Sequence, residues 1–437
     1  MPTPSLILVP ARFKTGKLYT PVATTSGGVV LGASGDFNVT RATTATRVNA
    51  SGLIESVASG IPRLDYYTSG GTAGCPALLV EPGATNGAPD VQHLKGPGLA
   101  AASGGPTITT GSTDFLAPDG TSGSITKYVG GAASGAVQNA FYTGFTPTIS
   151  AAGTYTFSLF VKAGATNPLN FCALQFTQYT GGSGTAISYF SLASGTALTT
   201  GASIQNYGNG WYRLISAPYT IAAGDLVGNV LFNLAEGNGD VTWPASGALN
   251  LTAYAWGAQI EAGSVATSYI PTTTGSATRN ADVVSVLGAV SGCIGQTEGT
   301  IYAEVDIRAF ANLGVFLSIS NGGGNDRIEI YKNTDSKIYF DRVSATQGGG
   351  STTVSSNALT AGTFKVAVAY KSGDTTMYIN GTQIGTTQTQ TFTFLSITKI
   401  TIGTNRADIS QFNDRIRAVA LYTTRLTNTE LAALTTL

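Results

Sequence analysis

Alternation of apolar and polar positions is the strongest pattern along this chain, and it predicts strands. In residues 154–162 (TYTFSLFVK), Tyr155, Phe157, Leu159 and Val161 fall on one face. The same period recurs in 171–179, 211–217 and 249–263, where it groups Cys172, Leu174 and Phe176; Trp211, Arg213 and Ile215; and Tyr254, Trp256, Ala258 and Ile260. Gly, Asn, Asp and Pro clusters separate the runs, as is typical of an antiparallel sandwich or jelly roll.

A second set of strands follows a polar, Thr-rich stretch at 264–282. In residues 298–310, the alternation directs Ile301, Ala303, Val305 and Ile307 inward and Tyr302, Glu304, Asp306 and Arg308 outward. The Asn380-Gly381 pair predicts a tight hairpin turn. At the end of the chain, Thr427 and Glu430 have the spacing of a capping box. They predict one short helix whose buried stripe is Leu431, Leu434 and Leu437.

These patterns predict an all-β protein in four parts. Residues 1–90 form an irregular N-terminal anchoring and assembly segment. Residues 91–265 form one antiparallel β-sandwich of jelly-roll type, and residues 266–289 connect it to the next. Residues 290–437 form a second antiparallel sandwich that ends in the short helix.

Composition narrows the class of function. Of the 437 residues, 11% are charged, with 23 basic and 23 acidic residues, so sequence-independent nucleic-acid binding is not expected. Hydrophobic residues make up 42%, enough for packed cores. No apolar run approaches a membrane-spanning length, and the start does not resemble a signal peptide. The three cysteines are expected to be free thiols, and the single histidine, His93, to be solvated.

The segment from Gly52 to Asn86 combines short apolar runs with charged residues. The runs at 52–58 and 76–82 flank a glycine-rich stretch at 68–74. Two such strands cannot bury themselves alone, so they need the next module or neighbouring subunits. Arg63, Asp65 and Glu81 are therefore the assembly candidates. Arg63 and Asp65 form either an ion pair across such a junction or a surface ion pair that contributes little to stability.

Two resemblances extend this interpretation. The segments GTFKVAVAYKSGDTTMYINGTQIG, ITIGTN and DRIRAVALYTTRLTNTELAAL resemble concanavalin A-like, laminin-G-like sandwiches. The stretch FNVTRATTATRVNASGLIESVASGIPRLDYYTSGGTAGCPALLVEPGATN resembles a segment of bacteriophage head and tail fibre proteins. There it precedes jelly rolls similar to carbohydrate-binding modules, which NGWYRL and YAWGAQIEAGSVATSYIPT also resemble. The continuation GAPDVQHL departs from that pattern.

The fibre resemblance implies a structural component of a phage particle. Its N-terminal part would attach to capsid or tail proteins, and its sandwiches would adhere to host surface glycans. Such fibres are commonly homotrimers, and the chain would be made in the host cytoplasm, released by lysis and located in the virion. A decoration protein without a ligand and a glycan depolymerase are the alternatives.

Candidate glycan-binding residues come from loop composition. Trp243 lies in DVTWPASG, whereas Trp211 and Trp256 lie in strand patterns and are expected in the core. In the second module, Asn405, Arg406 and Asp408 share the loop GTNRADISQFND, and sandwich-rim loops commonly carry recognition.

Catalysis and metal binding have weaker signals. Glu304 and Asp306 share a strand face at a spacing compatible with a carboxylate pair, but without the third acid of the Glu-x-Asp-x-Glu pattern. We expect a solvated charged face there, no catalytic residue and no cofactor. Asp335, Asp341, Asp374 and Asp408 lie in or beside turns without a compact calcium loop, which leaves a structural calcium ion open.

Overall fold

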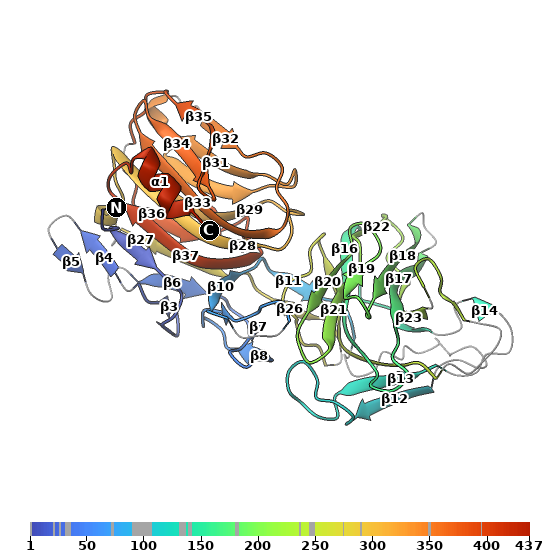
Figure 1. The fold of residues 1–437 in the computed structure, drawn as a ribbon. Coiled ribbons are helices and arrows are strands. Elements are labelled where there is room, and N and C mark those ends of the chain that lie inside the picture. The colour runs from blue at the N-terminus through green and yellow to red at the C-terminus, as the bar shows by residue number, and fades with distance from the viewer. Residues whose placement is uncertain are drawn as a thin grey trace.

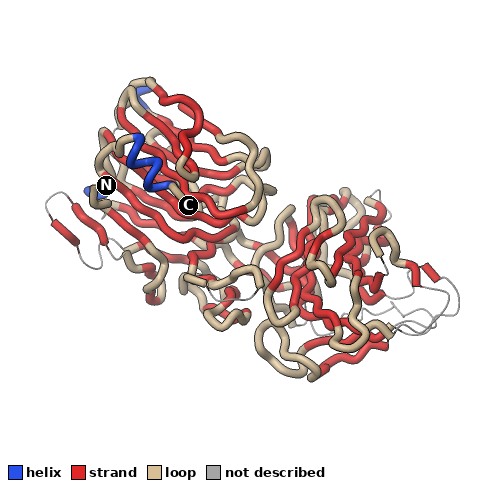
Figure 2. Tube along the Cα trace, in the orientation of Figure 1, coloured by secondary structure: helices blue, strands red, loops and turns tan. Residues whose placement is uncertain are grey.

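The fold is seen in a computed structural model of the chain. It describes residues 2–20, 22–25, 28–30, 36–70, 74–89, 107–130, 137–138, 142–179, 183–235, 237–243, 250–273, 275–288, 291–347, 351–394 and 396–437. Two β-rich lobes are visible, joined by the N-terminal segment and the connector (Figure 1). Strands dominate both lobes, and one short helix lies on the lobe that contains both termini (Figure 2). The predicted all-β class with antiparallel sandwiches and a terminal helix is confirmed.

The first lobe packs a seven-stranded sheet on a five-stranded sheet. The larger sheet has the order β12 (Thr107–Ser112), β13 (Ile125–Val129), β25 (Thr252–Ala262), β16 (Gly153–Ala163), β21 (Trp211–Ile215) and β20 (Ser203–Asn206), with β22 (Tyr219–Ile221) beside β16. The smaller has the order β15 (Tyr142–Phe145), β23 (Asn229–Ala235), β17 (Phe171–Tyr179), β18 (Gly184–Ser191) and β19 (Thr196–Ala197).

The second lobe packs a ten-stranded sheet on a nine-stranded sheet. The first has the order β35 (Thr382–Gln388), β34 (Thr375–Ile379), β33 (Gly362–Lys371), β28 (Glu298–Ile307), β37 (Asp414–Tyr422), β1 (Leu6–Leu8), β4 (Val22–Thr25) and β5 (Gly28–Val30), with β10 (Ala77–Val80) beside β37 and β9 (Leu64–Asp65) beside β10. The second has the order β2 (Phe13–Lys14), β3 (Lys17–Leu18), β6 (Phe37–Thr40), β27 (Val283–Leu287), β36 (Lys399–Ile402), β29 (Gly314–Ser320), β30 (Arg327–Lys332), β31 (Ile338–Val343) and β32 (Ser351–Ser355).

Short ribbons and helices complete the described structure. The two-stranded pairs are β7 (Ala45–Val48) with β8 (Ile54–Val57), β11 (Ala84–Asn86) with β26 (Ala277–Arg279), and β14 (Val137–Gln138) with β24 (Thr242–Trp243). The helices are α1 (Asn428–Thr435) and two 3-10 turns, Ser291–Cys293 and Ala345–Gln347. Among the described residues, no helix is long and apolar enough to cross a membrane.

The N-terminal segment supplies strands to both sheets of the second lobe. One edge of β37 pairs with β28, and β10 and β1 divide the other edge between them. Leu6 and Leu8 of β1 have no exposed surface and belong to the same core as Ile301 and Val419. On the opposite sheet, β6 pairs with β27 from the connector. Strands from the two ends of the chain therefore share one core.

A β-bulge in β25 changes which face its side chains occupy. Phe160 pairs with Trp256 and Ser158 pairs with Gln259, so the register shifts between these pairs. Gly257 lies in the bulge with a φ of 64°, and a Cβ there would lie 3.0 Å from the Phe160 ring. Tyr254 and Trp256 consequently lie in a different apolar cluster from Ala258 and Ile260. The prediction that all four share one face is wrong, because strict alternation does not survive a bulge.

Other local predictions have mixed outcomes. Thr427 and Glu430 form the predicted capping box, and both Asn380 and Gly381 have positive φ as the hairpin turn requires. Leu431 is buried, but Leu437 lies beyond the end of α1 and is 68% exposed, so the predicted stripe is too long. The predicted inward face of β28 is confirmed. Its other face is not fully solvated as expected, because α1 and its neighbours form an apolar cluster that includes Tyr302.

The shared core predicts that strand β1 stabilises the second lobe. Leu8→Ala should lower the free energy of unfolding by about 2–5 kcal/mol, because it leaves a cavity beside β37. Chemical denaturation followed by circular dichroism measures this loss. Val9→Ala is the matched control: Val9 is 49% exposed, so its substitution should have little effect. Equal denaturation midpoints for the two variants would show that β1 is dispensable.

Candidate functional site

Arg63 and Glu81, two of the predicted assembly residues, lie in a fully buried ion cluster. Arg63 pairs with Glu81 at 2.6 Å and also with Asp282, which follows β26 in the connector. Arg41 pairs with Asp282 at 2.9 Å, and Arg279 pairs with Glu81 at 2.9 Å. All five side chains are at most 3% exposed. We call these five residues the junction cluster.

Hydrogen bonds from the connector complete the coordination of Glu81. Ser268 donates its backbone N–H (2.8 Å) and its hydroxyl (2.7 Å) to the Glu81 carboxylate. Burial alone would raise the pKa of Glu81, but Arg279 and Arg63 outweigh it and hold the pKa well below the usual range. The carboxylate is therefore ionised, and the cluster joins the N-terminal segment to the connector.

The same network reaches the first lobe. Arg279 donates to the hydroxyl of Thr267 at 3.1 Å, and Thr267 donates to Glu261 of β25 at 2.6 Å. Arg213 of β21 donates to the carbonyl oxygen of Thr267 at 2.7 Å. A continuous set of polar contacts thus extends from the junction cluster to the larger sheet of the first lobe.

Asp65 lies apart from Arg63, facing the second lobe. It pairs with Arg415 of β37 at 3.4 Å and accepts hydrogen bonds from the backbone N–H groups of Val48 (2.9 Å) and Tyr67 (3.0 Å). Both residues of the predicted Arg63–Asp65 pair are buried, and each has other partners in the same chain. The interpretation as a surface pair is therefore wrong. Any role of Arg63, Asp65 or Glu81 in contacts with other proteins stays a prediction.

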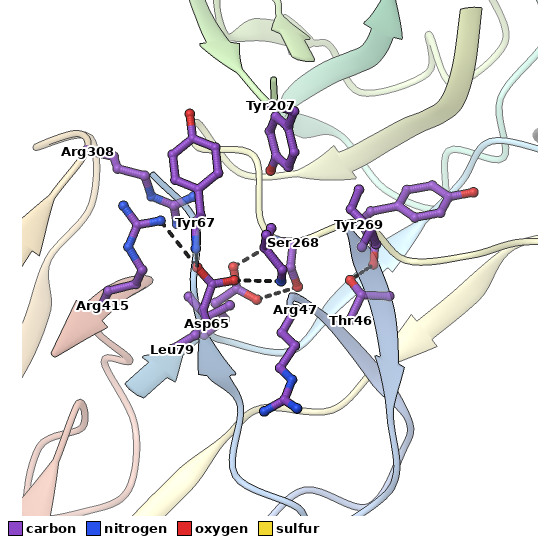
Figure 3. Close-up of a pocket in the computed structure, with 13 residues that line it drawn as sticks. Thr46, Arg47, Asp65, Tyr67, Leu79, Tyr207, Ser268, Tyr269, Arg308 and Arg415 are labelled. Atoms are coloured by element: carbon purple, nitrogen blue, oxygen red, sulfur yellow. Dashed lines mark hydrogen bonds and ion pairs between the residues drawn. The ribbon is translucent and has the colours of Figure 1, made fainter. Parts of the chain in front are cut away.

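A small pocket lies between the lobes beside Asp65 (Figure 3). Tyr67 of the N-terminal segment and Tyr207 of the first lobe line it and pack against each other, with ring centroids 4.9 Å apart. Arg308 and Arg415 border it from the second lobe. Its volume is about 20 Å³. That is enough for a water molecule but far below the roughly 300 Å³ at which ligand pockets begin. This pocket is part of the junction between the lobes, and it does not fit a sugar.

A ligand-sized groove lies where hairpin β7–β8 meets the first lobe. Its volume is about 400 Å³. Trp256 and Tyr269, whose ring centroids are 4.6 Å apart, line it on one side. Polar residues of the hairpin and of the β12–β13 loop line the rest: Thr46, Glu55, Ser56, Asp119, Thr121, Ser122 and Ser124. We call it the acidic groove, after Glu55 and Asp119.

The bulge at Gly257 gives the acidic groove its aromatic wall. It places Trp256 on the outer face of the sheet, where Ile54 of the hairpin and Tyr269 of the connector pack with it. On the rim, Glu55 accepts from Arg47 (2.7 Å) and Asn49 (3.1 Å). Sequence reasoning placed Trp256 correctly among buried residues, since it is 4% exposed, but gave no signal for this groove.

A second groove, with a volume of about 320 Å³, lies on the other side of the β12–β13 loop. Its lining is mainly apolar: Leu53 of the hairpin turn, Phe115 and Leu116 of the loop, and Tyr207 and Trp211 of the first lobe. Among the described residues of the lining, Lys162 of β16 is the one that carries a charge. Burial lowers the pKa of this lysine from its ordinary value. We call this the aromatic groove.

The predicted loop residues of the second lobe are engaged with one another and with their own sheet. The Asn405 side chain accepts from the backbone of Ala407 at 2.9 Å. Arg406 pairs with Glu329 of β30 at 3.5 Å, and Asp408 pairs with Lys399 of β36 at 3.0 Å. The structure brings Asn405, Arg406 and Asp408 together in one loop, where these contacts order the loop itself; a glycan contact there stays a prediction.

Two other residues named in the sequence analysis, Trp243 and His93, are not fully described by the structure. The backbone of Trp243 lies in β24 and pairs with Val137 of β14, rather than in a free loop. Its side chain lies outside the description. His93 also lies outside the described residues.

The acidic residues weighed for catalysis or calcium have basic or polar partners. Asp306 is buried, accepting from Arg417 and Thr363 at 2.8 Å each. Burial would raise its pKa, but Arg417 and Arg415 lower it, so Asp306 stays ionised. The expected solvated face is therefore wrong for this residue. The turn aspartates form the pairs Asp335–Lys337, Asp341–Arg327, Asp374–Arg425 and Asp408–Lys399. Within the described ranges, no three His, Cys, Asp or Glu side chains group to hold a metal ion.

The junction cluster predicts a strong effect of neutralising Glu81. Glu81→Gln should lower the free energy of unfolding by about 3–5 kcal/mol, because it leaves buried Arg279 without its carboxylate partner and leaves Asp282 as the one carboxylate of the junction cluster. Chemical denaturation at neutral pH measures the loss. Glu55→Gln is the control: Glu55 is 35% exposed in its pair with Arg47, so its loss should cost about 1 kcal/mol or less.

The difference between wild type and Glu81→Gln should also depend on pH. The folded-state pKa of Glu81 is depressed, so its stabilisation is complete above the unfolded-state pKa, near 4.3. As the pH falls below that value, the difference between the two proteins should narrow. A difference that stays constant down to pH 3 would contradict the assigned ionisation of Glu81.

Comparison with known proteins supports the expected fold of the second lobe. Residues 275–432 match the concanavalin A-like lectin/glucanases superfamily. A search of curated proteins found no match.

Among solved structures, the CBM40 of a Ruminococcus gnavus IT-sialidase bound to α2,3-sialyllactose is 20% identical, covering 34% of this chain and 88% of that chain with a TM-score of 0.31. A leech intramolecular trans-sialidase is 19% identical, and the match covers 32% of this chain and 23% of the trans-sialidase chain with a TM-score of 0.29. A SAP-like pentraxin from Limulus polyphemus is 14% identical, and the match covers 31% of this chain and 68% of the pentraxin chain with a TM-score of 0.24. The family comparison therefore assigns a similarity to one part of the chain: residues 275–432 are similar to concanavalin A-like lectins and glucanases.

Proposed function

We propose that this chain binds glycans through its β-sandwich lobes and does so as a head or tail fibre of a bacteriophage particle. The acidic groove is the observation that carries the glycan part. It combines an aromatic wall, Trp256 and Tyr269, with hydroxyl and carboxylate groups in a cavity of about 400 Å³. Sugars present many hydroxyl groups, which the hydroxyl and carboxylate groups of this lining can bind, and the small exposed parts of Trp256 and Tyr269 supply apolar contact. The similarity of residues 275–432 to a lectin-containing superfamily is consistent with this proposal.

Binding without catalysis is the form of this proposal that the contacts favour. A retaining pair of carboxyl groups works at about 5–5.5 Å, and the catalytic acid needs a raised pKa. In β28 the pKa of Asp306 is instead lowered, and its Oδ1 accepts from both Arg417 and Thr363. These contacts do not favour the depolymerase alternative at this strand.

The phage part of the proposal rests on the resemblance of residues 37–86 to fibre proteins. Because strands of this segment are integrated into the second lobe, attachment would use surfaces that the core leaves free. In the described sheet order β5 is the last strand, beside β4, and a terminal strand can add a strand from another chain. Capsid or tail proteins, and further copies of this chain in a homotrimer, are the proposed partners, and the virion is the proposed location.

Glycan adhesion is tested with the full-length chain on intact bacterial cells. Labelled protein should bind saturably, and periodate oxidation of the surface sugars should abolish the binding. Ser122→Trp, which fills the acidic groove from its exposed rim, should reduce binding about tenfold or more, whereas Thr110→Trp, on exposed β12 outside the groove, should not. Binding that survives both oxidation and Ser122→Trp would refute glycan recognition at this groove. Absence of the chain from purified particles by antibody labelling would refute the fibre assignment.

A further inference from the structure

The aromatic groove contains a cation, Lys162, that has no acidic partner among the residues that the structure describes. Lys162 extends from β16 so that its Nζ lies 4.5 Å from the centroid of the Phe115 ring, and it donates to the backbone carbonyl of Asn209. Within the described parts of the chain, no carboxylate lies within ion-pair distance of Lys162. Other lysines do have one: Lys127 pairs with Asp114 at 2.7 Å, and Lys399 pairs with Asp408 at 3.0 Å.

The local backbone is shaped to hold Lys162 in this position. Asn209 and Gly210 have φ values of 50° and 77°, and this left-handed turn carries the carbonyl that accepts from Lys162. A Cβ at Gly210 would lie 2.7 Å from the lysine Nζ. The pKa of Lys162 is lowered because its partial burial disfavours the charged form of the amine. An ammonium group has three donors, so the bond to Asn209 leaves further donors for a ligand.

We propose that the aromatic groove binds a carboxylate-bearing sugar residue, whose carboxylate pairs with Lys162 and whose ring packs against Tyr207 and Phe115. Charge complementarity selects the acidic sugar over a neutral one, because an anion would compensate a cation that has no carboxylate partner in the described part of the chain. The volume of about 320 Å³ is within the range of small-ligand pockets. This inference rests on the proposed function, since it assumes that the ligand is a saccharide.

The same hairpin and the same β12–β13 loop contribute different residues to the two grooves, so one polysaccharide could occupy both. Hairpin residues 52–53 line the aromatic groove and 54–56 the acidic groove. Loop residues 115–118 line the aromatic groove, and residues 119 and 121–124 line one side of the acidic groove. At the rim of the acidic groove, Asp119 has no basic partner among the described residues, and its carboxylate disfavours an anionic sugar there. A chain that alternates neutral and acidic sugars would place each kind of residue in the groove that suits it.

An array of bacterial polysaccharide fragments tests this inference. Each fragment is spotted in its native form and after chemical reduction of its carboxyl groups to alcohols, and the full-length protein is applied at low salt. The native form should bind about tenfold or more tightly than the reduced form, since hydrogen bonds to charged groups are among the strong ones. Lys162→Met should remove the preference, and Lys162→Arg should retain it. Lys127→Met, which removes a lysine from the same sheet outside the groove, is the matched control and should leave the preference unchanged.

The outcomes separate the inference from the proposed function. If bound fragments keep their signal after carboxyl reduction, the protein still binds glycans and the role of Lys162 is refuted. That comparison uses wild-type protein alone, so it decides the question even if Lys162→Met does not fold. If no fragment binds in either form, this inference fails, and the periodate experiment on cells decides separately whether the chain binds glycans.

Discussion

Arg63 has no exposed surface, and its guanidinium lies between two carboxylates from distant parts of the chain, Glu81 and Asp282. A buried charge without its partner costs several kcal/mol, so the fold requires these residues to meet. Their meeting places the N-terminal segment against the connector that joins the lobes. From there, Arg279 and Thr267 continue the polar contacts to Glu261 of the first lobe, and the contact of Asp65 with Arg415 reaches the second lobe. The relative position of the three parts therefore depends on one buried set of ion pairs and hydrogen bonds.

This dependence extends to the proposed binding surface. Hairpin β7–β8 belongs to the N-terminal segment, yet it forms one wall of both ligand-sized grooves on the first lobe. The opposite walls come from the β12–β13 loop and from the sheet, where the bulge at Gly257 directs Trp256 outward. Neither groove is complete in an isolated sandwich. The N-terminal segment is therefore a structural component of the recognition surface, in addition to any role in attachment.

Local features of the fold could be predicted from the sequence, whereas long-range pairings could not. Alternation in 154–162, the Asn380-Gly381 turn and the Thr427–Glu430 capping box each depend on neighbouring residues, and each is confirmed. Nothing local specifies that β1 pairs with β37 at the far end of the chain, or that Arg63 meets Asp282 rather than Asp65. The bulge at Gly257 also escaped prediction, because alternation assumes an unbroken pleat. The grooves depend on such long-range contacts and therefore leave no local signal in the sequence. Loop composition pointed instead to Asn405, Arg406 and Asp408, whose polar groups have partners within the chain.

The central claim is that ligand binds where the N-terminal hairpin meets the first lobe. Amide hydrogen–deuterium exchange of the full-length protein, with and without a saturating glycan that it binds, measures this directly. The account predicts slower exchange in residues 52–56, 115–124 and 207–211, which form the walls of the two grooves. Protection confined to residues 403–410 of the second lobe, with no change around the hairpin, would contradict it.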